Sequence, residues 1–487
     1  MPNKMLDELK PIAGWTEKDL KQVTISGHDP VSPTRFLIGE TAAGIHAACG
    51  LAAAKLWELR TGHRQHVAVD VNSAAATFQS FLYLRLLDAP PQPPPGFFGG
   101  FLATSDNRWF FVHPGTDPMT LLKVLECEAN QDSCVVAVKK RNSGELEDAF
   151  ADHGLNGAIA RTAEEWAVHP QGKILSRMPV VEIIKIGSSP PEPLPQGNRP
   201  LSGVRCLDLT RVLAGPTCSR TLAEHGADVL WVGAQHLPDV TAFNIDTSHG
   251  KRSTFLDLRE SGNTEKLWKL TEQADVFCQS YRLGAVAGRG FSPEEVAAKR
   301  PGIVYAFMNC YGPVGPWAGR RGWEQLAQTV TGLALEEGQL PPPPIDDMLL
   351  KQWGSFYTQS WHTPAGRPRL LPGAVTDYMT GYMLALGTMV ALYKRALEGG
   401  SYVVRTSLTQ SAMCVERLGR VDREQAMSQP EVLSSELLNK LYIEEDTKTS
   451  YGRIKYFGPV VQMSETPARW ALPTVPRGTH EPIWLDR

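Results

Sequence analysis

The sequence predicts an α/β protein in which a doubly wound parallel sheet is joined to a smaller α+β domain. Strand-like and helix-like segments alternate through residues 201–340, as in such a sheet. Stretches rich in proline and glycine, residues 88–101 and 187–200, separate this region from mixed helix and strand segments before it. One layout occurs on both sides of the region, at residues 36–63 and 373–400. A chain of 487 residues therefore holds more than one unit.

The strands of the predicted sheet are apolar and short. GVRCLDLT, DVLWVG, ADVFCQS and GIVYAFMN follow one another with a helix pattern between each pair. Earlier in the chain, RWFFVHP is a short strand candidate and PVVEIIKI, residues 179–186, is a buried strand candidate. Sheets of the doubly wound kind bind ligands beyond the carboxyl ends of their strands.

When the two copies of the layout are aligned, Glu40 corresponds to Asp377, 337 residues later in the chain. Each copy has a carboxylate, a long helix with glycine and alanine, a glycine turn and an alternating strand. Gly44 falls on Gly381, and such small residues let another backbone approach a helix. The period is too long for a solenoid, so it indicates a duplicated half or a fused pair.

These features divide the chain into six segments. They are residues 1–90, the first copy of the carboxylate helix; 91–186, a glycine loop and small domain; 187–200, a linker; 201–340, the doubly wound domain; 341–430, the second copy; and 431–487, a closing strand and tail.

Composition excludes several classes of partner. Hydrophobic residues make up 42% of the chain, charged residues 21%, and the net charge is −3, so nothing indicates nucleic acid binding. No run of about 18 apolar residues predicts a membrane span, and neither end of the chain carries a recognisable targeting signal. The eight cysteines are far apart and are expected to be reduced thiols without a metal. We expect a cytoplasmic protein.

The loop after the first strand of the sheet is a candidate phosphate site. Gly215 lets the backbone approach a ligand, and Pro216 suits the start of a helix whose free N–H groups attract anions. A Gly-Pro pair also simply begins helices, so both interpretations stay open. The G-x-G-x-x-G pattern is absent, which removes the main support for a nicotinamide dinucleotide.

Four basic residues in this region are predicted at strand ends facing the crevice: Arg211, Lys251, Arg252 and Arg282. Positive charges there would suit a phosphorylated ligand. The alternative is that each is a solvated surface charge.

The carboxylates of the repeated layout are the most informative residues. Asp377 precedes a helix that begins near Tyr378, and it could be the N-cap of that helix. It could instead be a nucleophile that attacks an activated acyl group and forms a mixed anhydride. The helix N-terminus would favour its ionised form.

Residues 200–420 resemble, motif by motif, the class III coenzyme A transferases, which include formyl-CoA transferase, carnitine CoA-transferase and α-methylacyl-CoA racemase. The matching segments are LSGVRCLDLTRVLAGPTCSRTLAEHGADVLWV, HGKRSTFLDLR, ADVFCQSYRLGA, RPGIVYAFMNCYGPVGP, GWEQLAQTVTGL and TDYMTGYMLALGTMVAL. Residues 30–198 resemble the second half of the same family. The resemblance implies an interlocked fold with a CoA-binding domain. It also implies acyl transfer between CoA thioesters and free acids through an aspartyl anhydride.

The resemblance implies roles for individual residues. Asp377 stands at the nucleophile position, Glu324 matches a carboxylate that orients it, and residues 96–100 match a glycine loop that covers the site. The residues expected to bind the CoA ester are Arg211, Val212, Ala214, Gly215, Lys251, Arg252, Arg282, Trp323, Gly99 and Gly100. The implied partners are an acyl-CoA, as co-substrate, and a carboxylic acid.

Two departures from the family bear on the reaction. Leu213 stands where formyl-CoA transferases have a glutamine, which argues against a small oxalate-like acid. Trp323 stands where racemases have a histidine that supplies a second acid/base. We therefore rank a CoA transferase above a racemase or epimerase of 2-substituted acyl-CoA. A scaffold that has lost CoA chemistry is the third interpretation.

The order of segments differs from that of a standard family member. The chain reads as a fused pair that lost the first nucleotide half and the second small domain. One complete site would remain, with a possible vestigial second site around Glu40. Such a chain would be either a monomer with an internal pseudo-dimer or a homodimer.

Overall fold

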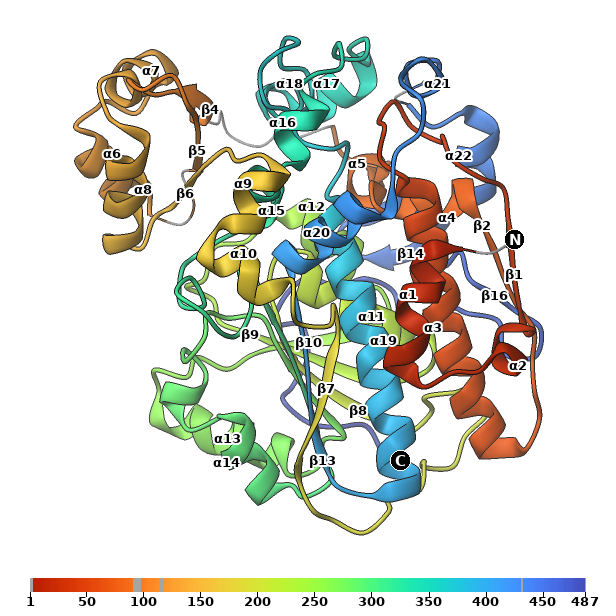
Figure 1. Ribbon diagram of the computed structural model, residues 1–487. Helices are drawn as coiled ribbons and strands as arrows, with labels where there is room; N and C mark the ends of the chain where they lie inside the picture. The colour runs from red at the N-terminus through yellow and green to blue at the C-terminus, as the bar shows by residue number, and fades with distance from the viewer. Residues whose placement is uncertain (1–2, 91–97, 114, 116, 431, 487) are drawn as a thin grey trace.

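A seven-stranded sheet organises the centre of the molecule (Figure 1). The computed structural model describes residues 3–90, 98–113, 115, 117–430 and 432–486. The strands of the sheet are, in spatial order, β10 (Lys251–Phe255), β9 (Asp228–Gly233), β8 (Arg205–Leu209), β11 (Val276–Gln279), β12 (Val304–Asn309), β13 (Ser401–Ser407) and β7 (Glu182–Gly187). All neighbours are parallel except β13 and β7. The chain order reverses between β8 and β11, as in a doubly wound sheet. The α/β prediction with a large parallel sheet is confirmed.

Both faces of the sheet are covered, which explains why β8, β9, β11 and β12 read as mostly apolar runs. Leu207, Leu230 and Phe277 pack in one buried cluster with α13 (Ser261–Thr271) and α14 (Pro293–Lys299). Cys206 and Val229 point to the opposite face, in a cluster with α11 (Ala214–Glu224) and α19 (Val375–Glu398). Figure 1 shows these two helix layers on opposite sides of the strands.

The segment at residues 179–186 is an edge strand, so the prediction of a buried strand there is wrong. β7 begins at Glu182 and runs antiparallel to β13. Its residues are half-buried or exposed because β7 ends the sheet on that side. The buried valines, Val180 and Val181, lie just before the strand.

A small lobe projects from the main body (Figure 1). Its antiparallel sheet joins β4 (Gly100–Ala103), β5 (Trp109–His113) and β6 (Asn156–Ile159). The short strand predicted in RWFFVHP is β5, the central strand of this sheet. Three helices cover this sheet around a separate core that includes Phe110 and Phe150: α6 (Pro118–Leu125), α7 (Gln131–Lys139) and α8 (Ser143–Asp152). The lobe returns to the main body through α9 (Ala163–Val168) and α10 (Pro170–Leu175).

A short sheet reproduces part of the large one. It consists of β1 (Val23–Ser26), β2 (Val67–Asp70) and β16 (Gln462–Met463). β1 is parallel and β16 antiparallel to β2, just as β12 and β7 flank β13. The register agrees as well: Met463 pairs with Val67, and Ile183 pairs with Val404, which lies 337 residues after Val67.

Two helices of 24 residues, α3 (Ile38–Thr61) and α19, carry the repeated layout at the same offset. Gly44 of α3 lies against α1 (Lys4–Ala13), where an added Cβ would be 2.7 Å from the Cβ of Met5. Gly381 of α19 lies against α11, where an added Cβ would be 2.3 Å from the carbonyl oxygen of Ala214. Helix α1 therefore packs on α3 as α11 packs on α19, because glycine in each helix lets the partner backbone approach.

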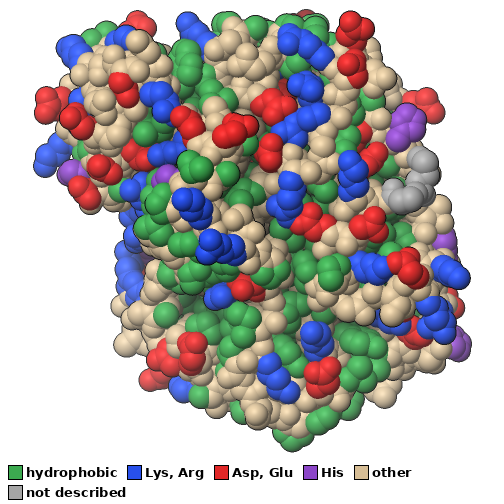
Figure 2. Space-filling view, viewed as in Figure 1, with side chains coloured by type: hydrophobic (Ala, Val, Ile, Leu, Met, Phe, Trp, Pro, Cys, Tyr) green, Lys and Arg blue, Asp and Glu red, His purple; other side chains and the backbone are tan. Residues whose placement is uncertain are grey.

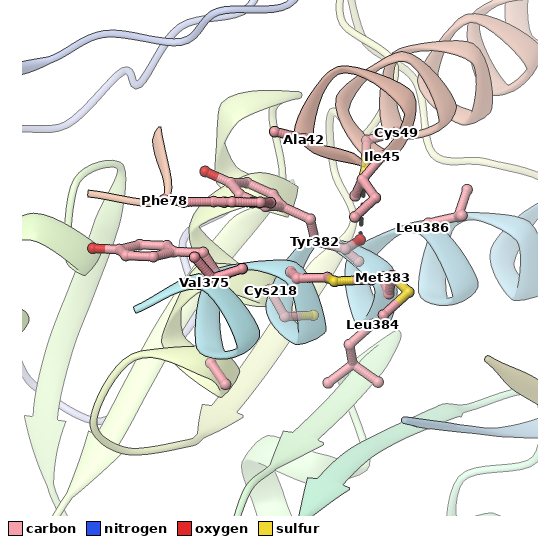
Figure 3. Close-up of a cluster of buried hydrophobic side chains, with 14 of the residues drawn as sticks. Ala42, Ile45, Cys49, Phe78, Cys218, Val375, Tyr382, Met383, Leu384 and Leu386 are labelled. Carbon is pink, nitrogen blue, oxygen red and sulfur yellow. Dashed lines mark hydrogen bonds between the residues drawn. The ribbon is translucent and has the colours of Figure 1, made fainter. Parts of the chain in front are cut away.

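The two long helices also pack on each other (Figure 3). The Cys49 thiol of α3 donates to the Tyr382 carbonyl of α19 at 3.2 Å, which is the dashed contact in Figure 3. Ala42 and Ile45 lie on the α3 side and Met383 and Leu386 on the α19 side. Through this contact the two helices share one hydrophobic core.

The C-terminal segment returns to the seven-stranded sheet after the hairpin of β14 (Tyr442–Thr449) and β15 (Gly452–Phe457), which pairs with β3 (Arg85–Leu86). Beyond β16 the chain follows the outer edge of β10. The Gly250 amide donates to the Leu472 carbonyl at 2.9 Å, and the His480 amide donates to the Ser253 carbonyl at 2.7 Å. The tail thus covers an edge strand that would otherwise expose unpaired backbone groups.

The remaining elements are short or connect these parts. They are α2 (Glu17–Leu20), α4 (Val71–Thr77), α5 (Ser80–Tyr83), α12 (Thr241–Thr247), the 3₁₀ helix Ala287–Arg289, α15 (Glu324–Thr331), α16 (Leu333–Glu337), α17 (Asp347–Trp353), α18 (Ser355–Trp361), α20 (Leu408–Leu418), α21 (Arg423–Met427) and α22 (Ser435–Leu441).

Acidic and basic side chains are interspersed over the face shown in Figure 2, as the small net charge leads one to expect. Within the described ranges, none of the helices combines the length and the apolar character that a membrane span requires. All eight cysteines are free thiols, and seven are buried.

Candidate active site

Asp377 and Glu324 meet at the N-terminus of α19. Asp377 lies in the first turn of this helix and is 8% exposed. Glu324 begins α15, and its Oε1 accepts hydrogen bonds from the backbone amide (3.4 Å) and hydroxyl (3.2 Å) of Thr376. Gln328, one turn later in α15, donates to the same oxygen. Glu324 therefore caps the helix that carries Asp377, and a simple N-cap role for Asp377 is excluded.

Burial controls the ionisation of this pair. It raises the pKa of Glu324 to about 7, even though the hydrogen bonds from Gln328 and Thr376 act in the opposite direction. Burial, and next the negative charge of Glu324, raise the pKa of Asp377 well above its usual range. When two carboxyl groups share a site with little water, ionisation of one makes ionisation of the other less favourable.

A cavity of about 370 Å³ reaches the residue before Glu324, although neither Asp377 nor Glu324 is among the residues that line it. Trp323, which directly precedes Glu324, forms part of its wall together with the predicted residues Arg211 and Val212. Gly115 and Pro118 of the small lobe line the opposite side. The cavity therefore lies between the doubly wound sheet and the lobe.

Val212 has a backbone conformation that valine rarely adopts. Its φ is +69°, in the left-handed region, where a β-branched side chain is strained. Val212 follows β8 at the point where the strand order reverses and lines the cavity. Strain of this kind clusters at ligand sites, where the surroundings hold it in place.

A second cavity, of about 270 Å³, lies beyond the carboxyl ends of β8, β9 and β10. Gly233, Leu256 and Tyr281 contribute to its wall, together with Arg289 and an ion pair between Arg259 and Asp257. Beyond the carboxyl ends of the strands is where a doubly wound sheet binds its ligand.

Lys251 and Arg252 do not lie at the carboxyl end of a strand, where they were predicted, so that placement is wrong, and their role in CoA binding stays a prediction. They begin β10 and therefore lie at its amino end. The Lys251 ammonium is 3.1 Å from the carboxylate of Asp208 and donates to the Pro216 carbonyl at 2.8 Å. Arg252 pairs with Asp228 at 2.9 Å. Both side chains are buried in structural ion pairs.

Ala214 and Gly215 have a packing role, and their predicted contact with the ligand stays a prediction. Both are buried in the first turn of α11. An added Cβ at Gly215 would lie 2.4 Å from the Cβ of Thr210, so glycine is needed there for the turn after β8 to close. Pro216 is the third residue of α11, not the first.

Arg282 lines a third cavity, of about 380 Å³, together with Arg320 and Arg321 at the junction with the lobe. Gly99 and Gly100 lie at the start of β4 with φ of +121° and +82°. An added Cβ at Gly99 would be 2.4 Å from the Val112 carbonyl, so this glycine serves the lobe's own sheet. Gly96 of the predicted loop lies outside the described residues.

Glu40, the counterpart of Asp377, has a different carboxylate neighbour. Asp29 accepts hydrogen bonds from the backbone amides of Gly39 (3.0 Å) and Glu40 (2.7 Å). It thereby caps α3 as Glu324 caps α19. Burial is the main cause that raises the pKa of Asp29 to about 6. The Glu40 side chain is half-exposed, whereas that of Asp377 is buried.

Several site residues were missed by sequence reasoning. Arg259 follows the end of β10 and could have been found had the strand been placed correctly. Trp231 reads as an ordinary buried strand residue, and Arg477 lies in a tail without a motif, yet both line the first cavity. Asp29 carried no signal beyond a turn-like Asp-Pro pair.

Comparison with known proteins agrees with this architecture. A model of CoA-transferase family III matches residues 201–418. An acyl-CoA transferase of Gibberella moniliformis is 31% identical over 435 residues, which cover 78% of this chain and 72% of that protein. An acetyl-coenzyme A transferase, nodX, of Hypoxylon pulicicidum is 30% identical over 329 residues, which cover 63% of this chain and 52% of that protein. A formyl-CoA:oxalate CoA-transferase of Rhodopseudomonas palustris is 29% identical over 242 residues, which cover 47% of this chain and 51% of that protein. This chain therefore spans about half the length of the last two relatives. The sequence match and the doubly wound sheet together show that the chain belongs to CoA-transferase family III.

Proposed function

We propose that this protein transfers CoA between an acyl-CoA thioester and a carboxylic acid, with Asp377 as the nucleophile. The observation that carries the proposal is the buried Asp377–Glu324 pair, in which Glu324 directly follows Trp323 of the first cavity's wall. A carboxylate held in a water-poor site attacks a thioester carbonyl while few water molecules compete for the intermediate.

The proposed reaction has two balanced halves. The Asp377 carboxylate attacks the thioester carbonyl and the carbon–sulfur bond breaks. CoA leaves as a thiolate, and the acyl group stays on Asp377 as a mixed anhydride. The thiolate then attacks the aspartyl carbonyl, which releases the first carboxylic acid and leaves an aspartyl CoA thioester. The acceptor carboxylate reverses these two steps, so a new acyl-CoA leaves and Asp377 is regenerated.

Glu324 has a positioning role in this scheme. It fixes the first turn of α19 through Thr376, and its charge keeps the pKa of Asp377 high. Asp377 must be ionised to attack, so turnover should rise with pH until the pair carries its full charge.

We further infer that the chain is an internal pseudo-dimer. The equivalent packing of α1 on α3 and of α11 on α19 supports a fused pair in which α1 and β1 remain from a first nucleotide half. In this interpretation one complete site is left, at Asp377, and the position of Glu40 is vestigial.

Two matched variants test the proposal. Asp377→Asn should abolish CoA transfer from acetyl-CoA to a panel of carboxylic acids, whereas Glu40→Gln, at the same helical position of α3, should keep wild-type turnover. Thermal melting of both variants checks that they are folded. Unchanged turnover in Asp377→Asn would refute the assignment of the nucleophile.

A racemase is the second candidate, and one contact favours it. The ring of His113 lies 4.7 Å from that of Trp323, which occupies the position of the racemase histidine. Burial lowers the pKa of His113 to about 4, so its imidazole is neutral and weakly basic near pH 7, and we rank this function second. Exchange of the α-proton of a 2-methylacyl-CoA in deuterated water, without any acid acceptor, would favour it.

A further inference from the structure

We propose that Arg477 of the C-terminal tail binds the diphosphate of the CoA ester together with Arg211. The proposal rests on the CoA-dependent function argued above. It assigns a ligand contact to a segment that lies far outside the matched family region.

The Arg477 side chain is held firmly at the crevice of the sheet. Its guanidinium carbon lies 5.4 Å from the ring centroid of Trp231 on β9 and 5.3 Å from that of Phe255 on β10. It also donates to the Ala234 carbonyl at 3.3 Å. The side chain is 9% exposed, so little of its charge is screened by solvent.

Arg477 and Arg211 converge on one loop. Arg477 donates to the Leu237 carbonyl, and Arg211 donates to the next carbonyl, that of Pro238. Burial, and to a smaller extent the charge of Arg477, lower the pKa of Arg211. Asp239 pairs with Arg477 at 2.7 Å and offsets one of the two positive charges. The pair retains an excess positive charge, which an anion would compensate.

The two arginines lie where the two cavities of the sheet adjoin. Both line the first cavity, next to Trp323. Ala234 and Leu237, whose carbonyls accept from Arg477, line the second. A CoA ester has its diphosphate between the adenosine and the pantetheine arm. An ester that spans both cavities, with its acyl group near Asp377, would place the diphosphate at this junction.

The test compares substrates with and without the nucleotide. In Arg477→Gln, kcat/KM for acetyl-CoA should fall about tenfold or more, as expected when one charge-assisted hydrogen bond to a phosphate is lost. The value for S-acetylpantetheine, which has no diphosphate, should stay within about twofold of wild type. Arg477→Lys should recover part of the loss for acetyl-CoA, because it restores the charge but not the planar guanidinium.

Arg469→Gln is the matched control, because Arg469 is an exposed arginine of the same tail. It should leave both substrates unaffected. Equal loss for both substrates in Arg477→Gln, together with a lower melting temperature, would show that Arg477 only anchors the tail and would overturn the proposal. So would acetyl-CoA kinetics equal to wild type. A wild-type protein that binds no CoA ester in calorimetry would instead refute the proposed function.

Discussion

Replacing Glu324 by glutamine should make the stability of the protein less sensitive to pH. Glu324 is 5% exposed, and burial raises its pKa from 4.5 to about 7. The folded state therefore holds this proton more tightly than the unfolded state. The free energy of unfolding falls as the pH rises from 4.5 to about 7, and the loss is complete above that range. At roughly 1.4 kcal/mol per pH unit, the loss amounts to about 3 kcal/mol.

Glutamine keeps an acceptor oxygen for Thr376 but cannot ionise, so Glu324→Gln should lack this loss. Relative to wild type, the variant should gain about 3 kcal/mol between pH 4.5 and about pH 8, measured by urea unfolding at both values. Glu294→Gln, an exposed substitution on α14, serves as the control. The pKa of Asp377 should also fall, so the acidic limb of kcat/KM should move to lower pH. An identical pH dependence of stability in wild type and variant would refute the reasoning.

Two further predictions concern packing. Gly381→Ala should destabilise the protein by about 1–3 kcal/mol, because the new Cβ would lie 2.3 Å from the Ala214 carbonyl, while Gly262→Ala, which meets open space, should be close to neutral in urea unfolding. Lys251→Met should cost roughly 3 kcal/mol by leaving the buried Asp208 without its cation, and should leave the Kd for acetyl-CoA unchanged. A clear loss of acetyl-CoA affinity in that folded variant would restore Lys251 to the binding site.

The features readable from sequence are those with a local pattern. Strands β8, β9, β11 and β12 are mostly apolar runs, and the 337-residue offset anticipated two helices of equal length. Asp377 could be placed at the start of α19 because a carboxylate before a glycine-rich helix is a visible signal, although its burial beside Glu324 depends on how α15 packs.

The residues whose positions could not be predicted from the sequence are those whose partners lie far away in the chain. Lys251 was predicted in the crevice because it is basic and near a strand, but it begins β10, and its ammonium pairs with Asp208 of β8. Arg477 reaches the cavity from a tail that runs along the outer edge of β10. The tail is irregular, so its sequence does not predict where it runs. Such long-range ion pairs have no periodicity to read.

The central claim is tested most directly by identifying the residue that becomes acylated. The protein is incubated with acetyl-CoA, trapped with hydroxylamine, digested and analysed by mass spectrometry. The account predicts a hydroxamate or CoA adduct on the peptide that contains Asp377, which disappears in Asp377→Asn and persists in Glu40→Gln. An adduct on Glu40, or turnover without any modification of Asp377, would contradict it.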